Sequence, residues 1–246
     1  MKITRFSLSA VSLFVLSAGL STFCLAQPAP TTYRVQVNHV KLDMLNEWLD
    51  LQKNEVVPAL KKGGVSTQTV VATTFGNTGE YLIIRPLDKY ADLDGPTPLV
   101  KALTQAGADR LIAKVRKCLE SQTVYTQTRQ VDLSNVLTTP PEVIVSVRYR
   151  ITPGKMDDFR ALVKSDVLPV YKKAKVQFIV NQRGPGANTN DVTMTTGYQK
   201  FAEMDGGPFL TKQLGAEGVA ALNAKFRPTR TLVEVVVRRR VDELSW

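Results

Sequence analysis

The stretch VVPALKK at residues 56–62 returns as VLPVYKK at residues 167–173, with the proline and the two lysines in the same places. A shift of 111 positions, which carries Pro58 onto Pro169, keeps identical residues aligned well beyond this phrase. About a third of the positions between Glu55 and Lys114 are identical in this register, which indicates a pair of related domains rather than a solenoid. We therefore predict an internal duplication. The same shift aligns Asn77 with Asn188, Asp94 with Asp205, Gly95 with Gly206, and Leu103 with Leu214.

A short segment without periodic apolar residues separates the two copies. SNVLTTPPE, residues 134–142, has two adjacent prolines, a composition typical of an extended linker. The whole chain is 43% hydrophobic and 22% charged, as expected of a globular protein with a core. We predict a first repeat over residues 33–133, the linker over 134–142 and a second repeat over 143–246, preceded by an extended terminus over 27–32.

Residues 1–26 have the pattern of a secretory signal peptide. Lys2 and Arg5 precede a run from Phe6 to Ala26 without any charged residue, and small residues stand where a signal peptidase cleaves. We expect cleavage after Ala26 and a periplasmic or secreted protein. Retention as a membrane anchor is the alternative, because the run approaches the roughly 20 residues that span a bilayer. Cleavage leaves Cys118 as the only cysteine of the mature chain, which excludes an internal disulfide.

Both copies have the same order of predicted elements. The strands YRVQV and VIVSVRY, which start at Tyr33 and Val143, alternate β-branched with polar residues. In each copy a helix with apolar residues at helical spacing follows, then two strands joined by a turn rich in Gly and Asn, a second helical region and a last strand. Pro58 and Pro169 are expected to bend or interrupt the last turns of the first helix, because proline removes a backbone donor.

The order βαββαβ predicts an α+β protein of two tandem ferredoxin-like repeats. In such a repeat both helices cover one face of a four-stranded antiparallel sheet and leave the other face bare. A bare sheet face in water would be poorly stable, so we expect the two repeats to cover each other.

In this arrangement the chain resembles the dimeric α+β barrel proteins, which include antibiotic-biosynthesis-monooxygenase-like (ABM-like) and NIPSNAP-like domains. The resemblance rests on the element order, on ITPGKMDDF at residues 151–159, and on the repeated helix-Pro-Lys-Lys phrase. It covers both copies and implies a pseudo-dimeric α+β barrel whose interior holds a ligand or substrate. Cofactor-free oxygenases of this group act on substrates that react with oxygen themselves. Haem-degrading members use an Asn, a Trp and a His; Asn38 is present here, but Trp48 is expected in the core and the required histidine is missing.

Polar residues on the strands are the main candidates for a binding site. Arg34 and Asn38 alternate with valines in the first strand, and Arg148 and Arg150 alternate with apolar residues in its counterpart. If these side chains point into a closed barrel, guanidinium groups at low dielectric would favour a carboxylate, phosphate or enolate ligand. The alternative is that they pair with groups such as Glu234 and join the two sheets. The predicted ligand-binding residues are Arg34, Asn38, His39, Tyr81, Arg148, Arg150 and Arg183, with Gln36 and Asn181 on the same polar faces.

The sequence contains no assembled catalytic motif. His39 is the only histidine, which nearly excludes a zinc site made by the protein. His39 itself is a candidate base or haem ligand, or an ordinary strand-end residue. Neither a phosphate-binding glycine loop nor a serine nucleophile motif occurs. We therefore expect no metal and no cofactor.

Charge and composition narrow the class of partner. The net charge of +10 comes from scattered basic residues, so we expect a solvated basic surface and no nucleic-acid partner. We also expect no stable membrane association after signal cleavage, and a monomer in which the duplication replaces a dimer. These features favour an exported, non-catalytic small-molecule-binding or accessory protein with a small anionic or polar organic ligand. The alternative is a cofactor-independent monooxygenase-like enzyme that acts on a small organic substrate in the barrel interior.

Overall fold

The helices and strands follow the predicted order in both parts of the chain. The structure, a computed structural model, describes residues 31–246, so the predicted signal peptide and its cleavage site lie outside the described residues. We call residues 32–133 the first half and residues 143–246 the second half. Within the described residues, no helix has the length and apolar content needed to cross a membrane.

The first half contains β1 (Thr32–Val40), α1 (Leu45–Leu51), α2 (Val57–Lys62), β2 (Thr69–Phe75), β3 (Glu80–Pro86), α3 (Pro98–Lys117) and β4 (Leu119–Arg129). The second half contains β5 (Val143–Ile151), α4 (Met156–Leu162), α5 (Leu168–Ala174), β6 (Gln177–Arg183), β7 (Asp191–Tyr198), α6 (Phe209–Phe226) and β8 (Arg230–Arg240).

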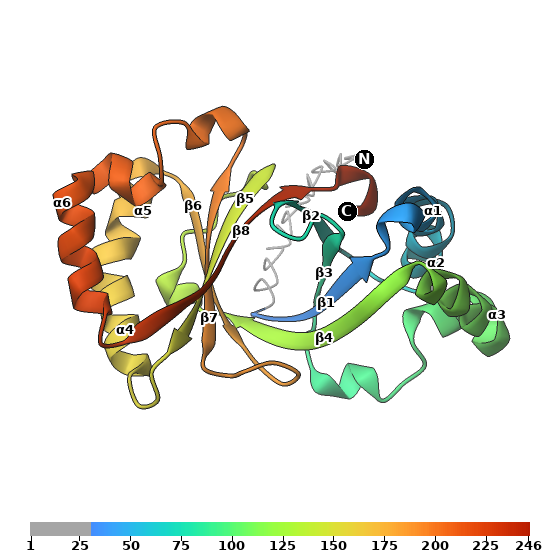
Figure 1. The fold of residues 1–246 in the computed structure, drawn as a ribbon. Coiled ribbons are helices and arrows are strands. Elements are labelled where there is room, and N and C mark those ends of the chain that lie inside the picture. The colour runs from blue at the N-terminus through green and yellow to red at the C-terminus, as the bar shows by residue number, and fades with distance from the viewer. Residues whose placement is uncertain (1–30) are drawn as a thin grey trace, which may run out of the picture.

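The strands form one closed barrel, and the helices lie outside it. Around the barrel the order is β1, β3, β2, β8, β5, β7, β6 and β4, which returns to β1. The last strand of each half joins the other half, because β4 pairs with both β1 and β6, and β8 pairs with both β5 and β2. Figure 1 shows the helices of the two halves on opposite outer sides, with the strands between them. The closed sheet therefore has its outer face against the helices of both halves and its inner face toward the barrel interior. The predicted dimeric α+β barrel fold is confirmed.

The repeated proline coincides with a π-helical turn in each half. α1 continues through the π turn Gln52–Val56 into α2, and α4 continues through the π turn Val163–Val167 into α5. Pro58 and Pro169 lie in the first turn of α2 and α5. A proline has no N–H to donate and its ring crowds the carbonyl four residues earlier, and a wider π turn accommodates both effects. The predicted interruption is therefore a single π turn in an otherwise continuous helical rod.

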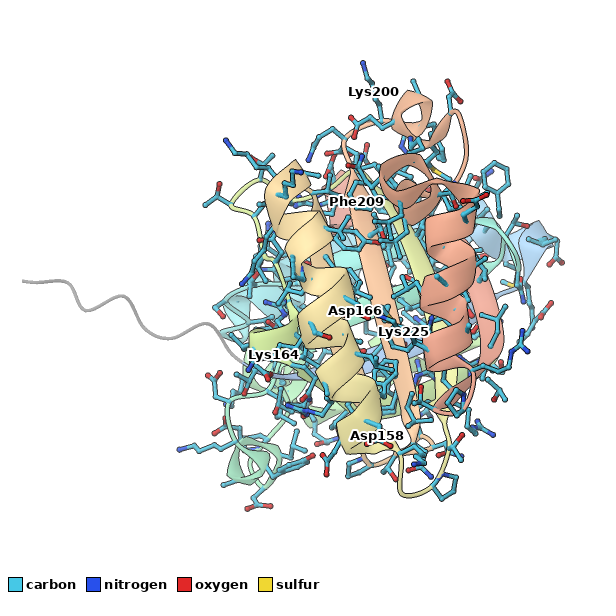
Figure 2. The ribbon with its side chains drawn as sticks, turned by 90° about the vertical axis from the view of Figure 1, so that its left-hand side faces the viewer. Asp158, Lys164, Asp166, Lys200, Phe209 and Lys225 are labelled. Carbon is cyan, nitrogen blue, oxygen red and sulfur yellow. The ribbon has the colours of Figure 1, made fainter. Side chains whose placement is uncertain are left out.

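Side-chain contacts and backbone angles also recur at the shift of 111 positions. Glu55 and Lys114 form an ion pair between the helices at 2.9 Å, and the aligned residues Asp166 and Lys225 form one at 2.7 Å. Figure 2 shows the second pair between the two helical segments of the second half, the rod of α4 and α5 on one side and α6 on the other. The two halves thus share local geometry as well as element order. The long helices α3 and α6 change direction at matching residues with positive φ, Thr104 (φ 69°) and Gly215 (φ 70°).

The linker, residues 134–142, lies against the barrel. Asn135 pairs with Phe178 of β6 through an isolated β-bridge. Pro141 packs over Gly197 of β7, where a Cβ atom would come within 2.8 Å of the proline ring, so only glycine leaves room for this approach. Several linker residues line the cavity inside the barrel, and the linker is therefore part of its wall.

Candidate functional site

One cavity, which we call the barrel cavity, lies inside the closed sheet. Its volume is about 520 Å³. Among the described residues its wall includes five arginines and a single glutamate, with apolar side chains between them. This excess of positive charge favours an anion. The polar and charged wall residues from the strands include Gln127, Arg129, Ser146, Arg148, Gln177, Asn181, Arg183, Thr193, Thr195, Glu234, Arg238 and Arg240.

Two arginines of the second half are held by carboxylates. Arg148 donates to Glu234 at 2.7 Å and to Asp191 at 3.1 Å, and Arg150 donates to Asp191 at 2.7 Å. Asp191 is 1% exposed, and burial alone would raise the pKa of its carboxyl group. The hydrogen bonds from Arg150 and Arg148 outweigh that effect and hold the pKa of Asp191 below its ordinary value. These contacts favour the interpretation that Arg148 and Arg150 join neighbouring strands.

The second cavity, which we call the helix–sheet cavity, lies in the first half between the sheet and the helices α2 and α3. Its volume is about 620 Å³, which suits a small organic molecule. The strands contribute polar side chains to its wall, whereas the helices contribute mostly apolar ones. The wall includes Arg34, Gln36, Ile83 and Arg85 from the strands, Gln52, Val56 and Leu60 from the first helical rod, and Pro98, Leu99, Leu111 and Val115 from α3.

Two arginines lie next to each other in the wall of the helix–sheet cavity. Arg34 of β1 is the direct cross-strand partner of Arg85 of β3. Burial lowers the pKa of Arg34, and burial together with the charge of Arg34 lowers the pKa of Arg85 to about 10. Within residues 31–246 neither forms an ion pair; Arg34 Nη1 donates to Gln36 at 3.3 Å, and Arg85 Nε donates to Gln68 at 2.7 Å. Both guanidiniums stay protonated at neutral pH, so this wall holds two adjacent positive charges with neutral hydrogen-bond partners. Asp88 and Asp92 line the same cavity but form no ion pair with either arginine.

Several amide side chains lie beyond this pair of arginines, and of these Asn38 and Gln52 are buried. Gln36 Nε2 and Gln122 Nε2 both donate to Asn38 Oδ1, at 3.1 and 2.9 Å. Asn38 is fully buried, and its Nδ2 has no hydrogen-bond partner in the described part of the chain. Gln52, which is 4% exposed, lies on the π turn and lines the cavity from the helix side. A buried amide nitrogen without a hydrogen-bond partner, here Asn38 Nδ2, indicates a place for a polar ligand or ordered water, although Asn38 itself is not in the cavity wall.

The same space in the second half is filled by aromatic side chains. Tyr171 stacks on Phe178 with 4.2 Å between the ring centroids and packs on Phe209 at 4.4 Å. Phe209 lies between the two helical rods in the view of Figure 2. At the aligned positions the first half has Leu60 for Tyr171 and Pro98 for Phe209. A cavity in this place is therefore a feature of the first half. The shift of 111 positions also aligns Arg34 with Val145, Gln36 with Val147 and Gln52 with Val163.

Some of the predicted site residues line one of the two cavities, whereas Asn38 and Arg150 line neither. Arg148 and Arg183 line the barrel cavity, as expected if they point into the barrel. Arg34 lines the helix–sheet cavity instead, and Asn38 is buried on the same side of β1. The condition that the polar strand residues point into the barrel is therefore not met by Arg34 and Asn38, because Val35 between them takes that direction. The first strands of the two halves carry their polar residues on opposite faces of the sheet.

Two other predicted residues lie outside both cavity walls. Tyr81 packs on Trp48 with 4.5 Å between the ring centroids, and Trp48 is fully buried, as the sequence predicts. His39 lies near the end of β1, with its Nδ1 3.1 Å from Asn77 Nδ2. Neither Tyr81 nor His39 lines a cavity described above, so neither is placed to contact a ligand there.

Arg85 and Gln52 belong to the helix–sheet cavity but were not predicted from the sequence. Arg85 is the last residue but one of the apolar strand EYLIIRP, and nothing in that pattern shows which face its side chain takes. Gln52 does leave a signal. It aligns with Val163, which is fully buried, and a polar residue at a core position indicates a functional or strained site.

Comparisons with known proteins identify the fold. No protein-family profile matches the sequence, and no curated protein matches it. A provisionally named monooxygenase from Fusobacterium nucleatum matches with a TM-score of 0.56 and 11% identity over 87% of this chain and 94% of that chain. One from Lactobacillus acidophilus matches with a TM-score of 0.55 and 9% identity over 85% and 93%. An anthrone oxidase-like protein matches with a TM-score of 0.53 and 12% identity over 85% and 91%. At such identities the likeness concerns the fold alone.

Proposed function

We propose that the protein binds a small organic anion in the helix–sheet cavity and has no catalytic role of its own. The observation that carries this proposal is the pair of Arg34 and Arg85, two adjacent, partly buried arginines without a carboxylate partner among the described residues. Like charges opposite each other in a sheet destabilise the folded protein unless an anion lies with them. A carboxylate, sulfonate or enolate would accept hydrogen bonds from both guanidiniums. The pair therefore favours a ligand with a negative charge.

The other wall residues indicate the chemical nature of the uncharged part of this ligand. Gln36 and Gln52 bring amide groups that form directional hydrogen bonds beside the charged end. Leu60, Leu99 and Leu111 line the side toward the helices and favour an apolar body. A compact aromatic or alicyclic acid satisfies both requirements.

We propose further that the two halves are tandem ferredoxin-like repeats with different roles. The first half holds the ligand, whereas Tyr171 and its aromatic neighbours make the second half a solid partner that completes the barrel. One chain then forms the pseudo-dimer by itself and binds one ligand as a monomer. A molar mass of one chain in light scattering is the expected result, and a stable dimer would contradict this part of the proposal.

We also propose that the protein acts in the periplasm or outside the cell, because residues 1–26 have the pattern of a secretory signal peptide.

A cofactor-independent monooxygenase-like enzyme is the second candidate function. Its support is that two proteins with this fold, from Fusobacterium nucleatum and Lactobacillus acidophilus, have provisional monooxygenase names. Such an enzyme acts on a substrate anion that reacts with oxygen, and Arg34 and Arg85 would stabilise an enolate or phenolate. Oxygen consumption separates the two functions. Binding of the natural ligand without oxygen uptake supports the binding protein, and sustained uptake with release of an altered ligand supports the enzyme.

Two fluorescent probes test the proposed binding function. Anilinonaphthalene sulfonate is an aromatic anion, and N-phenylnaphthylamine is a neutral compound of similar shape. We expect the protein to bind the anion, and the double variant Arg34→Val/Arg85→Met to bind it about tenfold to a hundredfold more weakly, because charge-assisted hydrogen bonds are lost. Binding of the neutral probe should change little. Arg239→Val, which removes an exposed strand arginine, is the matched control. Equal affinity of the double variant and the wild type for the anion would refute the proposal.

A further inference from the structure

The seam between β4 and β6 brings four polar residues together on the inside of the barrel. Gln127 lies opposite Arg183, and Arg129 lies opposite Asn181. All four line the barrel cavity. Because β4 belongs to the first half and β6 to the second, this group forms only where the two halves meet.

The two arginines of the seam have aromatic partners rather than acidic ones. The guanidinium of Arg183 lies 4.6 Å from the ring centroid of Tyr125, and that of Arg129 lies 4.8 Å from the ring centroid of Tyr33. Stacking on a ring holds a guanidinium in place while its N–H groups remain able to bind an anion. The Nε of each arginine is buried without a hydrogen-bond partner in the described structure, and the same is true of Asn181 Oδ1. The seam thus combines buried donors with a buried acceptor.

Other arginines of the barrel cavity differ from these two. Arg148 and Arg238 each form an ion pair with a glutamate at 2.7 Å. Within residues 31–246, Arg129 and Arg183 form no ion pair. The excess positive charge of the barrel cavity is therefore concentrated at the seam.

The hydroxyl group of Tyr125 adds another donor at this place. Tyr125 is 5% exposed and lines the barrel cavity. Burial raises the pKa of its hydroxyl group, although the positive charges of Arg183, Arg238 and Arg148 act in the opposite direction. The phenol is therefore protonated at neutral pH and able to donate.

We propose that the seam binds one phosphate group, at a site separate from the helix–sheet cavity. Arg129, Arg183 and the Tyr125 hydroxyl donate to the phosphate oxygens, and a protonated phosphate oxygen donates to Asn181 Oδ1. Sulfate and carboxylates are fully ionised at neutral pH and have no proton to offer. A phosphate group has its second pKa near about 6, so a protonated oxygen is within reach. The group belongs to free inorganic phosphate or to a small phosphomonoester, and the cavity of about 520 Å³ accommodates either.

Calorimetric titration of the purified chain in a phosphate-free buffer at neutral pH tests this site. The probes are inorganic phosphate, sulfate and glycerol phosphate. We expect one phosphate site per chain, weaker binding of sulfate, and a loss of phosphate affinity of about tenfold or more in Arg183→Gln. Arg129→Gln is the second variant, and Arg227→Gln, which removes an exposed arginine, is the control for net charge. Tighter binding of glycerol phosphate than of inorganic phosphate supports a phosphomonoester, and the reverse order supports the free ion.

Three results would overturn the assignment: no binding of either phosphate compound, equal affinity for sulfate, or phosphate binding that Arg183→Gln and Arg129→Gln leave unchanged. The outcome is independent of the function proposed for the helix–sheet cavity. Arg183→Gln should bind anilinonaphthalene sulfonate like the wild type, and Arg34→Val/Arg85→Met should bind phosphate like the wild type. Failure of one proposal therefore leaves a measurable result for the other.

Discussion

Replacing Arg34 by valine should make the ligand-free protein more stable while it weakens the binding of anions. Valine stands at the aligned position of the second half, Val145, where the strand packs on its helices. In the ligand-free protein the Arg34 guanidinium lies beside that of Arg85 and donates one hydrogen bond of 3.3 Å to Gln36. The substitution therefore removes a repulsion and a partly buried charge, and it loses one long hydrogen bond.

The size of the gain follows from the pKa of Arg85. The fall of the Arg85 pKa from its ordinary value to about 10 corresponds to at most about 3.4 kcal/mol for keeping this guanidinium charged, and contact with solvent reduces that limit. Burial is the larger cause and persists in the variant, so we assign about 0.5–1 kcal/mol to the repulsion by Arg34, within the range for like charges opposite each other in a sheet. Relief of the burial of Arg34 itself brings the expected gain in the free energy of unfolding to about 1–2 kcal/mol.

Urea denaturation at pH 7 measures this gain, which corresponds to a rise of about 2–8 °C in Tm. Arg239→Val removes an exposed strand arginine and should stay within about 0.5 kcal/mol of the wild type. The same Arg34→Val sample should bind anilinonaphthalene sulfonate more weakly, a trade-off that is common at binding sites. A loss of stability of more than about 1 kcal/mol would refute the reasoning, because it would mean that Arg34 is already well satisfied without a ligand.

Three further predictions concern other parts of the molecule. Asp191→Asn should lower the free energy of unfolding by about 3 kcal/mol at pH 7, because it removes the buried negative charge that pairs with two guanidiniums. The pKa of Asp191 is depressed in the folded state, so its contribution to the free energy of unfolding is complete above the ordinary pKa of about 4 and is lost as the pH falls through the folded value. The stabilities of wild type and variant should therefore converge in acid. A stability difference that is independent of pH would contradict the ion pairs. Leu60→Tyr, which copies Tyr171, should fill the helix–sheet cavity and abolish binding of both fluorescent probes while circular dichroism stays native; retained binding would place the probes elsewhere. Phe209→Ala should cost about 3–5 kcal/mol in thermal or urea unfolding, because it opens a cavity in the packed half, and a cost below about 1 kcal/mol would contradict that packing.

The order of the elements is predictable from the sequence because local signals determine it. Pro58 and Pro169 mark the same turn of two matching helices, and the turns that contain Asn77 and Asn188 separate strands at matching places. Alternating β-branched residues identify the strands, since side chains point to opposite faces of a sheet at every second position. None of these signals depends on contacts between distant parts of the chain.

Alternation along β1 does not predict which face of the strand meets the helices and which faces the barrel interior. Arg34 and Asn38 lie on one side of β1 and Val35 on the other, but alternation defines two faces without telling which one meets the helices. The ordinary rule, apolar side toward the helices, holds at Val145 of the second half. It fails in the first half because a polar cavity replaces part of the core. The residue pattern breaks the rule at the place where we propose that the ligand binds.

The pairing of arginines also depends on contacts that the sequence does not reveal. Arg238 reaches Glu80 at 2.7 Å across 158 positions of the chain, and so becomes a link between the two halves. Arg183 lies on the same barrel wall but stacks on Tyr125 instead. Both residues look alike in the sequence, and only the closure of the barrel separates a structural arginine from one able to bind an anion.

Native mass spectrometry of the protein, purified without denaturation, tests the binding claim most directly. We predict one acidic organic molecule bound to each chain of the wild type and of Arg239→Val, and no such molecule on Arg34→Val/Arg85→Met. A wild-type chain that carries no small molecule, or a ligand that the double variant retains at the same occupancy, would contradict the account.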